Sequence, residues 1–331
     1  MQKRKGAKSF GALLAMPAAA LVLLCAYPIP DLGQTAQTTG RPPEGRLPER
    51  ISDQTYRVSV DLINIFCSVW DRKTNSFITS LTREDFTVYE DNKKQEIINF
   101  NRETNLPLTI ALLIDTSQSV APKLKFEQEA AINFFQSVLK DQDRAMLVEF
   151  DSGVSMIQDF TNDPNLLAKR IRTLKAAGGT ALYDALYLTC DEKLIRETGR
   201  KTIVILSDGE DTASRRPFEE ALEMALRAEA TVYAISTTRG GFFGVDTVSK
   251  EGDRVLRKLA EETGGRIFLP FKVEELEDSF RQISQELRSQ YNIGYISSNP
   301  ARDGGYRRIE VRVAEKDTRV NFRKGYYAPT S

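Results

Sequence analysis

Two kinds of hydrophobic pattern alternate along the middle of the chain, from about residue 106 to residue 290. The first kind is a short run that is apolar almost throughout, and it occurs five times: Leu108–Ile114, Ala145–Phe150, Thr202–Leu206, Thr231–Ile235 and Arg266–Leu269. Runs of this length without polar alternation predict strands buried on both faces, which is typical of a parallel sheet.

The second kind is a stripe of apolar residues three or four positions apart, which predicts a helix with one buried face. Four such stripes lie between or after the strands: Phe126, Ala130, Phe134 and Val138; Phe218, Leu222, Ala225 and Leu226; Leu256, Leu259 and Ala260; Val273, Leu276, Phe280, Ile283 and Leu287. The alternation of strands and helices over 106–290 predicts an α/β domain with an open, doubly wound, mostly parallel sheet.

The segments on both sides of this domain, 55–105 and 291–331, have a different pattern. In the first, Tyr56, Val58 and Val60 alternate with polar residues, and the second contains similar alternation. Period-two alternation predicts strands with one buried face, and the polar run 71–75 predicts a turn between two of them. The two β-rich segments either pair into one β-sandwich, which the proximity of domain termini favours, or form separate small units.

The N-terminus has the layout of a secretory signal. Basic residues at positions 3, 4, 5 and 8 precede an apolar run from Phe10 to Tyr27. Residues 1–27 are therefore predicted to be a signal peptide cleaved after Ala26, or a retained membrane anchor; acylation at Cys25 and a buried N-terminal helix are the alternatives. Either signal outcome places the remainder outside the cytoplasm, secreted or in the cell envelope. Residues 28–54 lack apolar periodicity and predict a disordered linker.

Composition excludes several kinds of chemistry. The chain has 331 residues and no histidine, which excludes Ser-His-Asp catalysis and imidazole metal sites. Its three cysteines, at 25, 67 and 190, stand too far apart for a CxxC-type zinc site. The 46 basic and 46 acidic residues balance, and loss of the four basic residues in 1–26 leaves 42 against 46, a net charge of −4. This mildly acidic balance argues against nucleic-acid binding.

Hydroxyl and carboxylate side chains gather where the predicted strands end. Asp115, Ser117 and Ser119 follow the first strand, Thr180 lies in the loop 178–180, and Asp208 follows a later strand. Ligands of open parallel sheets bind at the carboxyl ends of the strands, so these side chains are predicted to share one edge. All of them are hard oxygen donors, which suit Mg²⁺; two carboxylates and three hydroxyls leave room in its shell for water or for an incoming carboxylate.

The same residues carry a family resemblance. Asp115-Thr116-Ser117-Gln118-Ser119, Gly178-Gly179-Thr180 and Ser207-Asp208-Gly209 resemble, in order and distance, the three metal loops of von Willebrand factor A domains. The resemblance covers about 106–290. It implies that Asp115, Ser117, Ser119, Thr180 and Asp208 form a metal-ion-dependent adhesion site for Mg²⁺, with Mn²⁺ or Ca²⁺ as substitutes, that the protein is not an enzyme, and that the metal binds an acidic residue of a protein partner.

Several further residues are candidates for a supporting role. The carboxylates Asp184, Glu210 and Asp211 are candidates for outer contacts of the metal site, and the loop residues Phe242 and Phe243 are candidates for contact with a partner. With Gly305-Tyr306 and Gly325-Tyr326-Tyr327, the flanking segments resemble a secreted bacterial subgroup, the VWFA-related proteins typical of Acidobacteria. A membrane contact is expected only through an uncleaved N-terminal segment.

Other interpretations stay open at this point. Asp115 at a strand end is compatible with a phosphoryl-transfer hydrolase that uses it as nucleophile, although the second aspartate of the DxDxT motif is replaced by Ser117. A structural domain with a vacant site is the third possibility. Cys67 lies in an apolar strand and Cys190 in a helix; two buried free thiols and a disulfide between them are both compatible with the sequence.

Overall fold

The five apolar runs of the sequence form five of the six strands of one sheet. The strands lie in the order β10-β9-β8-β5-β6-β7. Their bounds, in the same order, are Ile267–Phe268, Ala230–Ser236, Arg200–Ser207, Leu108–Asp115, Arg144–Phe150 and Val154–Thr161. Strands β10 to β6 run parallel to one another, and β7 is antiparallel to β6. The predicted mostly parallel α/β sheet is confirmed.

Strand β7 is the strand of this sheet that the hydrophobic pattern does not reveal. It lies at the edge, where its residues are exposed or only half-buried, and its pairing with β6 is interrupted by register shifts. A strand with one neighbour and no buried face has neither a continuous apolar run nor a clean alternation.

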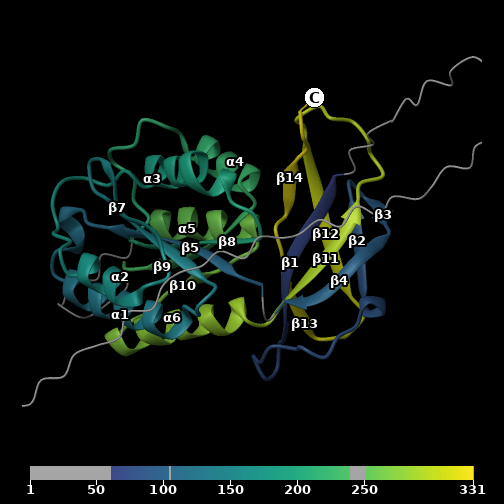
Figure 1. Cartoon of the computed structure of the whole chain (residues 1–331), viewed down its shortest axis with the longest axis horizontal. Coiled ribbons are helices and arrows are strands. Elements are labelled where there is room, and N and C mark those ends of the chain that lie inside the picture. The colour runs from purple at the N-terminus through teal and green to yellow at the C-terminus, as the bar shows by residue number, and fades with distance from the viewer. Residues whose placement is uncertain (1–60, 104–105, 239–249, 331) are drawn as a thin grey trace, which may run out of the picture. The chain divides into compact units, whose positions relative to one another are not determined.

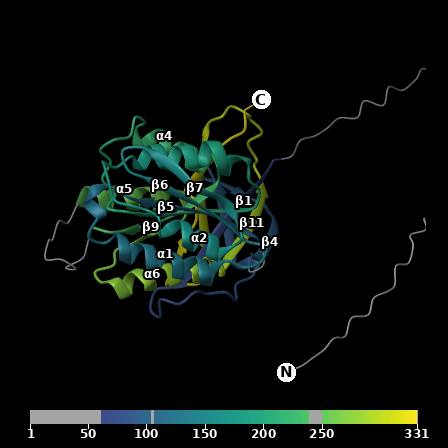
Figure 2. The same ribbon diagram turned by 60° about the vertical axis from the view of Figure 1, so that its left-hand side comes forward.

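Helices cover both faces of the sheet (Figure 1). One face carries α1 (Leu124–Val138), α2 (Pro164–Ile171) and α6 (Val273–Leu287), and the other carries α3 (Leu182–Leu188), α4 (Phe218–Arg227) and α5 (Lys250–Thr263). In Figure 2, α4 lies on the upper side of the sheet and α1, α2 and α6 lie on the lower side. Both faces of β5 are buried under these layers, which explains its continuous apolar sequence.

Helix α1 corrects one residue of the predicted apolar stripes. Phe126 is 44% exposed, whereas Glu127 is only 1% exposed. The buried face of the helix continues through Ala131, Phe134 and Val138. Because successive helix residues point about 100° apart, the face that contains Glu127 excludes Phe126.

Two four-stranded sheets combine strands from both flanking segments. Their orders are β13-β1-β11-β4 and β14-β12-β2-β3. The bounds are Leu62–Asp71 (β1), Phe86–Glu90 (β2), Lys93–Gln95 (β3), Ile97–Glu103 (β4), Gln290–Ile296 (β11), Tyr306–Val313 (β12), Thr318–Asn321 (β13) and Gly325–Tyr327 (β14). One hydrophobic core, with Val69, Val88, Tyr291 and Val311 among its members, joins the two sheets. The flanks thus pair into one sandwich, the first of the two arrangements that the sequence left open.

The structure is a computed structural model that describes residues 61–103, 106–238 and 250–330. The predicted signal segment 1–27, the linker 28–54 and the alternating residues before position 61 lie outside these ranges. Within them, no helix is long and apolar enough to cross a membrane. Cys67 and Cys190 are both buried free thiols, which decides between the two alternatives for this pair.

Candidate metal site

Strand β5 carries the first predicted ligand at its carboxyl end. Asp115 is the last residue of the strand and is fully buried. Its Oδ1 accepts a hydrogen bond from the backbone N–H of Ser117 at 2.8 Å, and its Oδ2 accepts one from the hydroxyl of Ser207 at 2.7 Å. Because Ser207 ends the neighbouring strand β8, the carboxylate is held between the ends of two adjacent strands.

Two serine hydroxyls connect the loop after β5 with the loop after β8. The Oγ atoms of Ser117 and Ser119 lie 2.9 Å apart, and Ser119 Oγ donates to Asp208 Oδ2 at 2.9 Å. Asp208 Oδ1 also accepts from the backbone N–H of Glu210 at 3.1 Å. Four of the predicted ligands therefore lie in one chain of short contacts, although 89 positions separate Ser119 from Asp208.

The third predicted loop, 178–180, lies against the first. The backbone N–H of Gln118 donates to the carbonyl of Gly178 at 3.1 Å, and that of Ala177 donates to the carbonyl of Thr116 at 2.7 Å. Thr180 itself is buried, with 5% of its surface exposed. The fold thus brings all three loops to the carboxyl edge of the sheet, as the sequence predicts.

Three hydroxyl residues that received no role from the sequence hold these loops in place. Ser207 fixes the carboxylate of Asp115, as described above. Ser152 accepts the backbone N–H of Gly179 at 2.7 Å, and Thr212 accepts that of Thr180 at 3.0 Å. Ser207 belongs to a motif that the sequence displays, but Ser152 and Thr212 are single residues far from their partners, and no local pattern marks them.

Burial dominates the electrostatics of Asp115. Removal from water, and to a smaller extent the negative charge of Asp208, raise the pKa of its carboxyl to about 6, against the hydrogen bonds from Ser207 and Ser117. The site therefore places negative charge where solvent does not stabilise it. A bound cation would compensate the energetic cost of this buried negative charge.

Glu127 adds a further acidic group, which no motif in the sequence marks. It lies on the buried face of α1, and neither of its carboxylate oxygens has a hydrogen-bond partner among the described residues. Burial raises its pKa to about 8; the ammonium of Lys123 opposes this rise, and the charges of Asp115 and Asp208 contribute to it. The carboxyl of Glu127 thus interacts electrostatically with the carboxylates of Asp115 and Asp208.

Two of the predicted supporting carboxylates bind backbone groups of the protein. Asp184 accepts the N–H groups of Arg215 and Arg216 at 3.0 and 3.1 Å. Asp211 accepts the N–H of Tyr183 at 3.0 Å. These bonds tie the segment after Asp208 to the start of α3, so both side chains support the loops that surround the ligands.

The other supporting candidates are less defined. Glu210 is exposed next to Asp208. Phe242 and Phe243 lie outside the described residues, so their predicted contact with a partner stays a prediction.

The residues at this edge fit a hard divalent cation. Their donors are the carboxylates of Asp115 and Asp208 and the hydroxyls of Ser117, Ser119 and Thr180, all of them oxygen ligands of the kind that Mg²⁺ prefers. The described part of the chain contains no cluster of three or more carboxylate or cysteine ligands. A cation here would therefore depend on the hydroxyls and on water as well as on the two carboxylates.

Comparison with known proteins agrees with this architecture. Residues 110–210 match the model of the von Willebrand factor type A domain. This match contains Asp115, Ser117, Ser119, Thr180 and Asp208. This region of the α/β part is thus similar to a von Willebrand factor A domain, in line with the resemblance in the sequence. No curated protein sequence matches the chain.

Solved structures with a similar fold come from diverse organisms. An aerotolerance-related membrane protein from Bacteroides fragilis is 16% identical, with 54% of this chain and 98% of that chain covered and a TM-score of 0.45. The PilB minor pilin from Streptococcus sanguinis is 16% identical, with 56% and 62% covered and a TM-score of 0.43. Proximal thread matrix protein 1 from the mussel byssus, in a structure whose MIDAS motif is occupied by zinc, is 14% identical, with 60% and 49% covered and a TM-score of 0.47. At these identities and TM-scores, the likeness says nothing about the function of this chain.

Proposed function

We propose that Asp115, Ser117, Ser119, Thr180 and Asp208 bind a divalent cation, with Mg²⁺ as the natural ion and Mn²⁺ or Ca²⁺ as substitutes. The proposal rests above all on the chain of short contacts from Asp115 through the serine hydroxyls to Asp208. The cation keeps a coordination position for an acidic side chain of a protein partner, because five protein donors do not fill an octahedral shell. The protein is thus a metal-dependent binding module of adhesion type.

The geometry of Asp115 favours binding over phosphoryl transfer. A nucleophilic carboxylate has to approach phosphorus with a free oxygen, but Asp115 is fully buried and both of its oxygens accept hydrogen bonds. Position 117, where the DxDxT motif has its acid–base aspartate, carries a serine. We therefore infer that the protein is not an enzyme.

A structural domain with a vacant site accounts less well for the charges. Burial and the charge of Asp208 both raise the pKa of Asp115, and Glu127 is buried nearby without a hydrogen-bond partner among the described residues. Such a cluster lowers stability unless a cation compensates it.

We further propose that this module works outside the cytoplasm, secreted or held in the cell envelope. The proposal rests on the basic cluster and apolar run within residues 1–27. Mass spectrometry of the protein recovered from cells distinguishes cleavage after Ala26 from a retained or acylated N-terminus. Recovery of the chain only from the cytoplasm, with residues 1–27 intact, would contradict it.

Calorimetric titration of the purified, metal-depleted chain tests the metal site. We expect Mg²⁺ and Mn²⁺ to bind at one site. Asp208→Asn, which removes a charge but keeps the shape of the side chain, should weaken the affinity at least a hundredfold, because a direct ionic ligand is lost. Asp115→Asn should have the same effect.

Asp141→Asn is the matched control, since Asp141 is exposed and precedes β6 at the opposite edge of the sheet. It should bind metal like the unchanged chain. Absence of metal binding by the unchanged chain, or equal binding by Asp208→Asn, contradicts the metal site.

A capture experiment tests the partner. Immobilised chain is exposed to envelope and extracellular fractions in Mg²⁺, and EDTA is then added. A partner of the site is retained in Mg²⁺, released by EDTA, and not retained by Asp208→Asn. Retention that ignores both EDTA and Asp208→Asn would show that binding uses another surface.

A further inference from the structure

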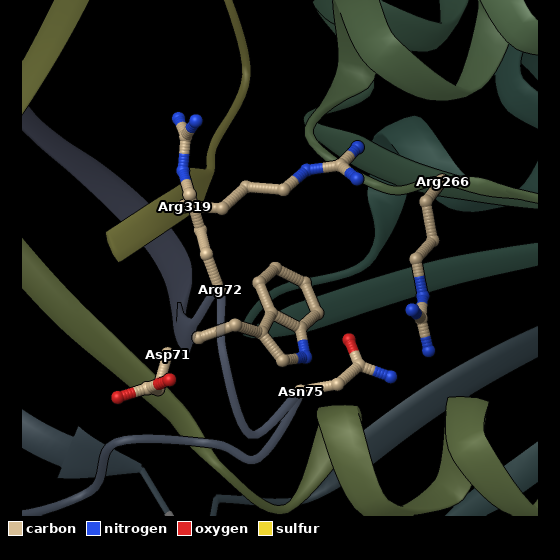
Figure 3. A pocket seen from close by; sticks show the side chains of 6 residues that line it. Asp71, Arg72, Asn75, Arg266 and Arg319 are labelled. Atoms are coloured by element: carbon tan, nitrogen blue, oxygen red, sulfur yellow. The ribbon is translucent and has the colours of Figure 1, made fainter. Parts of the chain in front are cut away.

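A polar pocket lies where the turn after β1 meets β13 and the residue before β10. Its volume is about 480 Å³, and six residues line it: Trp70, Asp71, Arg72, Asn75, Arg266 and Arg319 (Figure 3). Arg266 precedes β10, so the pocket lies at the opposite edge of the parallel sheet from the metal site. A volume of this size suits a small-molecule ligand, for which about 300–1,000 Å³ is usual.

The charges that line the pocket are mainly positive. Three guanidinium groups face one carboxylate, that of Asp71. Asp71 Oδ1 is engaged elsewhere, because it accepts the backbone N–H groups of Lys73 and Thr74 at 2.7 and 2.8 Å. Figure 3 shows this carboxylate pointing away from Arg266 and Arg319. Even with Glu286, which lies against Arg266 from outside the lining, the guanidinium groups outnumber the carboxylates three to two.

Arg266 is held in position by its surroundings. Its guanidinium lies 4.3 Å from the ring centre of Phe268 and 5.2 Å from that of Trp70. Its Nη2 donates to Gln282 Oε1 at 3.0 Å, and its Nε lies 3.1 Å from Glu286 Oε2. A guanidinium fixed by aromatic rings and an anchoring carboxylate is preorganised for an anion.

Arg72 and Arg319 are the adaptable members of the pocket. Both are exposed. Arg72 Nε donates to the carbonyl of Thr318 at 2.9 Å, which fixes the side chain beside β13 and leaves its Nη groups for another acceptor. Among the described residues, no hydrogen-bond acceptor or carboxylate pairs with the guanidinium of Arg319. Two exposed guanidinium groups of the lining thus keep donors for a ligand.

We propose that this pocket binds a small oxyanion ligand with two or more negative charges, a phosphate monoester or a dicarboxylate. Guanidinium groups match such ligands because they donate parallel hydrogen bonds to paired oxygens. The amide of Asn75 supplies a neutral donor in the same pocket. The site does not depend on the strand-end metal, so the protein has two binding sites of opposite charge preference at opposite sheet edges.

Calorimetry on the full chain tests the pocket, in metal-depleted Tris buffer at low salt without a chelating anion. Inorganic phosphate and succinate are the probes, and they distinguish the two sources of oxyanion. We expect at least one of them to bind at one site. Arg319→Ala and Arg72→Ala should each weaken this binding about tenfold, because each removes a charge-assisted hydrogen-bond donor. Both side chains are exposed, so the fold should survive, which thermal unfolding checks.

Arg312→Ala is the matched control, since Arg312 is an exposed arginine that pairs with Glu310 on β12 and does not line the pocket. Binding unchanged in Arg312→Ala and in Asp208→Asn supports the proposal. Preference for phosphate or for succinate identifies the ligand class. Absence of binding by both probes, equal affinity in Arg319→Ala and the unchanged chain, or an equal loss in Arg312→Ala overturns it.

Discussion

Glu127 shows how the surroundings of a single residue determine the pKa of its side chain. It occupies a helix position whose neighbours on the same face are apolar, and it is buried without a hydrogen-bond partner among the described residues. The charges of Asp115 and Asp208 contribute to its raised pKa. An ionisable group in this position is costly without a cation and becomes favourable when one binds. We infer that Glu127 supports metal binding through its charge, without being a ligand.

Glu127→Gln should therefore weaken Mg²⁺ binding by roughly fivefold, on the order of 1 kcal/mol, as expected for a charge acting across several ångströms. Loss of a direct ligand has a much larger effect. Calorimetric titration compares this variant with Glu129→Gln, which changes an exposed carboxylate on the same helix. If the two variants bind Mg²⁺ equally well, Glu127 has no part in the site.

At the scale of elements, the loop after β8 depends on a close approach to α5. Gly209 has a φ of +76°, and a Cβ at this position would lie 2.4 Å from the carbonyl oxygen of Gly252 in α5. A Cβ at Gly252 would in turn lie 2.1 Å from the carbonyl oxygen of Asp208. Glycines on both sides let the helix and the loop touch, and this contact fixes the position of Asp208 at the sheet edge.

Gly209→Ala should cost about 3 kcal/mol of unfolding free energy and weaken metal binding. The left-handed backbone accounts for roughly 1–2 kcal/mol, and displacement of the loop from α5 accounts for the rest. Urea unfolding and Mg²⁺ titration measure the two effects.

Gly199→Ala separates the backbone effect from the loop effect, because Gly199 has a φ of +82° but no atom of the described residues lies within 4 Å of an added Cβ. It should lose only the backbone part and bind Mg²⁺ normally. Equal stability and equal Mg²⁺ affinity in the two variants would show that the approach to α5 does not matter.

At the scale of the whole molecule, one buried carboxylate connects the sandwich with the α/β layers. Glu286 in α6 is fully buried; its Oε1 accepts the hydroxyl of Ser68 in β1 at 2.7 Å, and its Oε2 lies 3.1 Å from Arg266 Nε, which precedes β10. Burial raises its pKa to about 7, against the charge of Arg266 and the bond from Ser68. Strand β1 of the sandwich thus meets the α/β layers through a polar contact with α6.

The free energy of unfolding should depend on pH through the carboxyl group of Glu286. The pKa of Glu286 is raised in the folded chain above its ordinary value of 4.5, so the folded state holds the proton more tightly than the unfolded state. The contribution of Glu286 to the free energy of unfolding is complete below about pH 4.5. It is lost as pH rises through 7, a change of about 3 kcal/mol.

Glu286→Gln removes this titration. In urea unfolding at pH 5, 6, 7 and 8, the unfolding free energy of the unchanged chain should fall relative to that of the variant as pH rises. If the unfolding free energies of the two chains change with pH in parallel, Glu286 keeps an ordinary pKa in the folded chain.

The sequence alone determined the α/β class and the edge at which the site lies. Continuous apolar runs identify strands buried on both faces, and the residues directly after such strands reach the carboxyl edge whatever the details of packing. Asp115, Ser117, Ser119 and Asp208 could therefore be brought together from local pattern and spacing. That these residues hold a metal stays a proposal.

Tertiary structure decided what depends on partners distant in the chain. The rotation of α1 exposes Phe126 and buries Glu127, the edge position of β7 removes its hydrophobic pattern, and the pairing of both flanks makes one sandwich. The pocket of Arg72, Arg266 and Arg319 exists only because three segments meet there. Local pattern records which face of an element is apolar, whereas charge clusters and buried polar contacts arise from packing between segments, and no local sequence pattern encodes them.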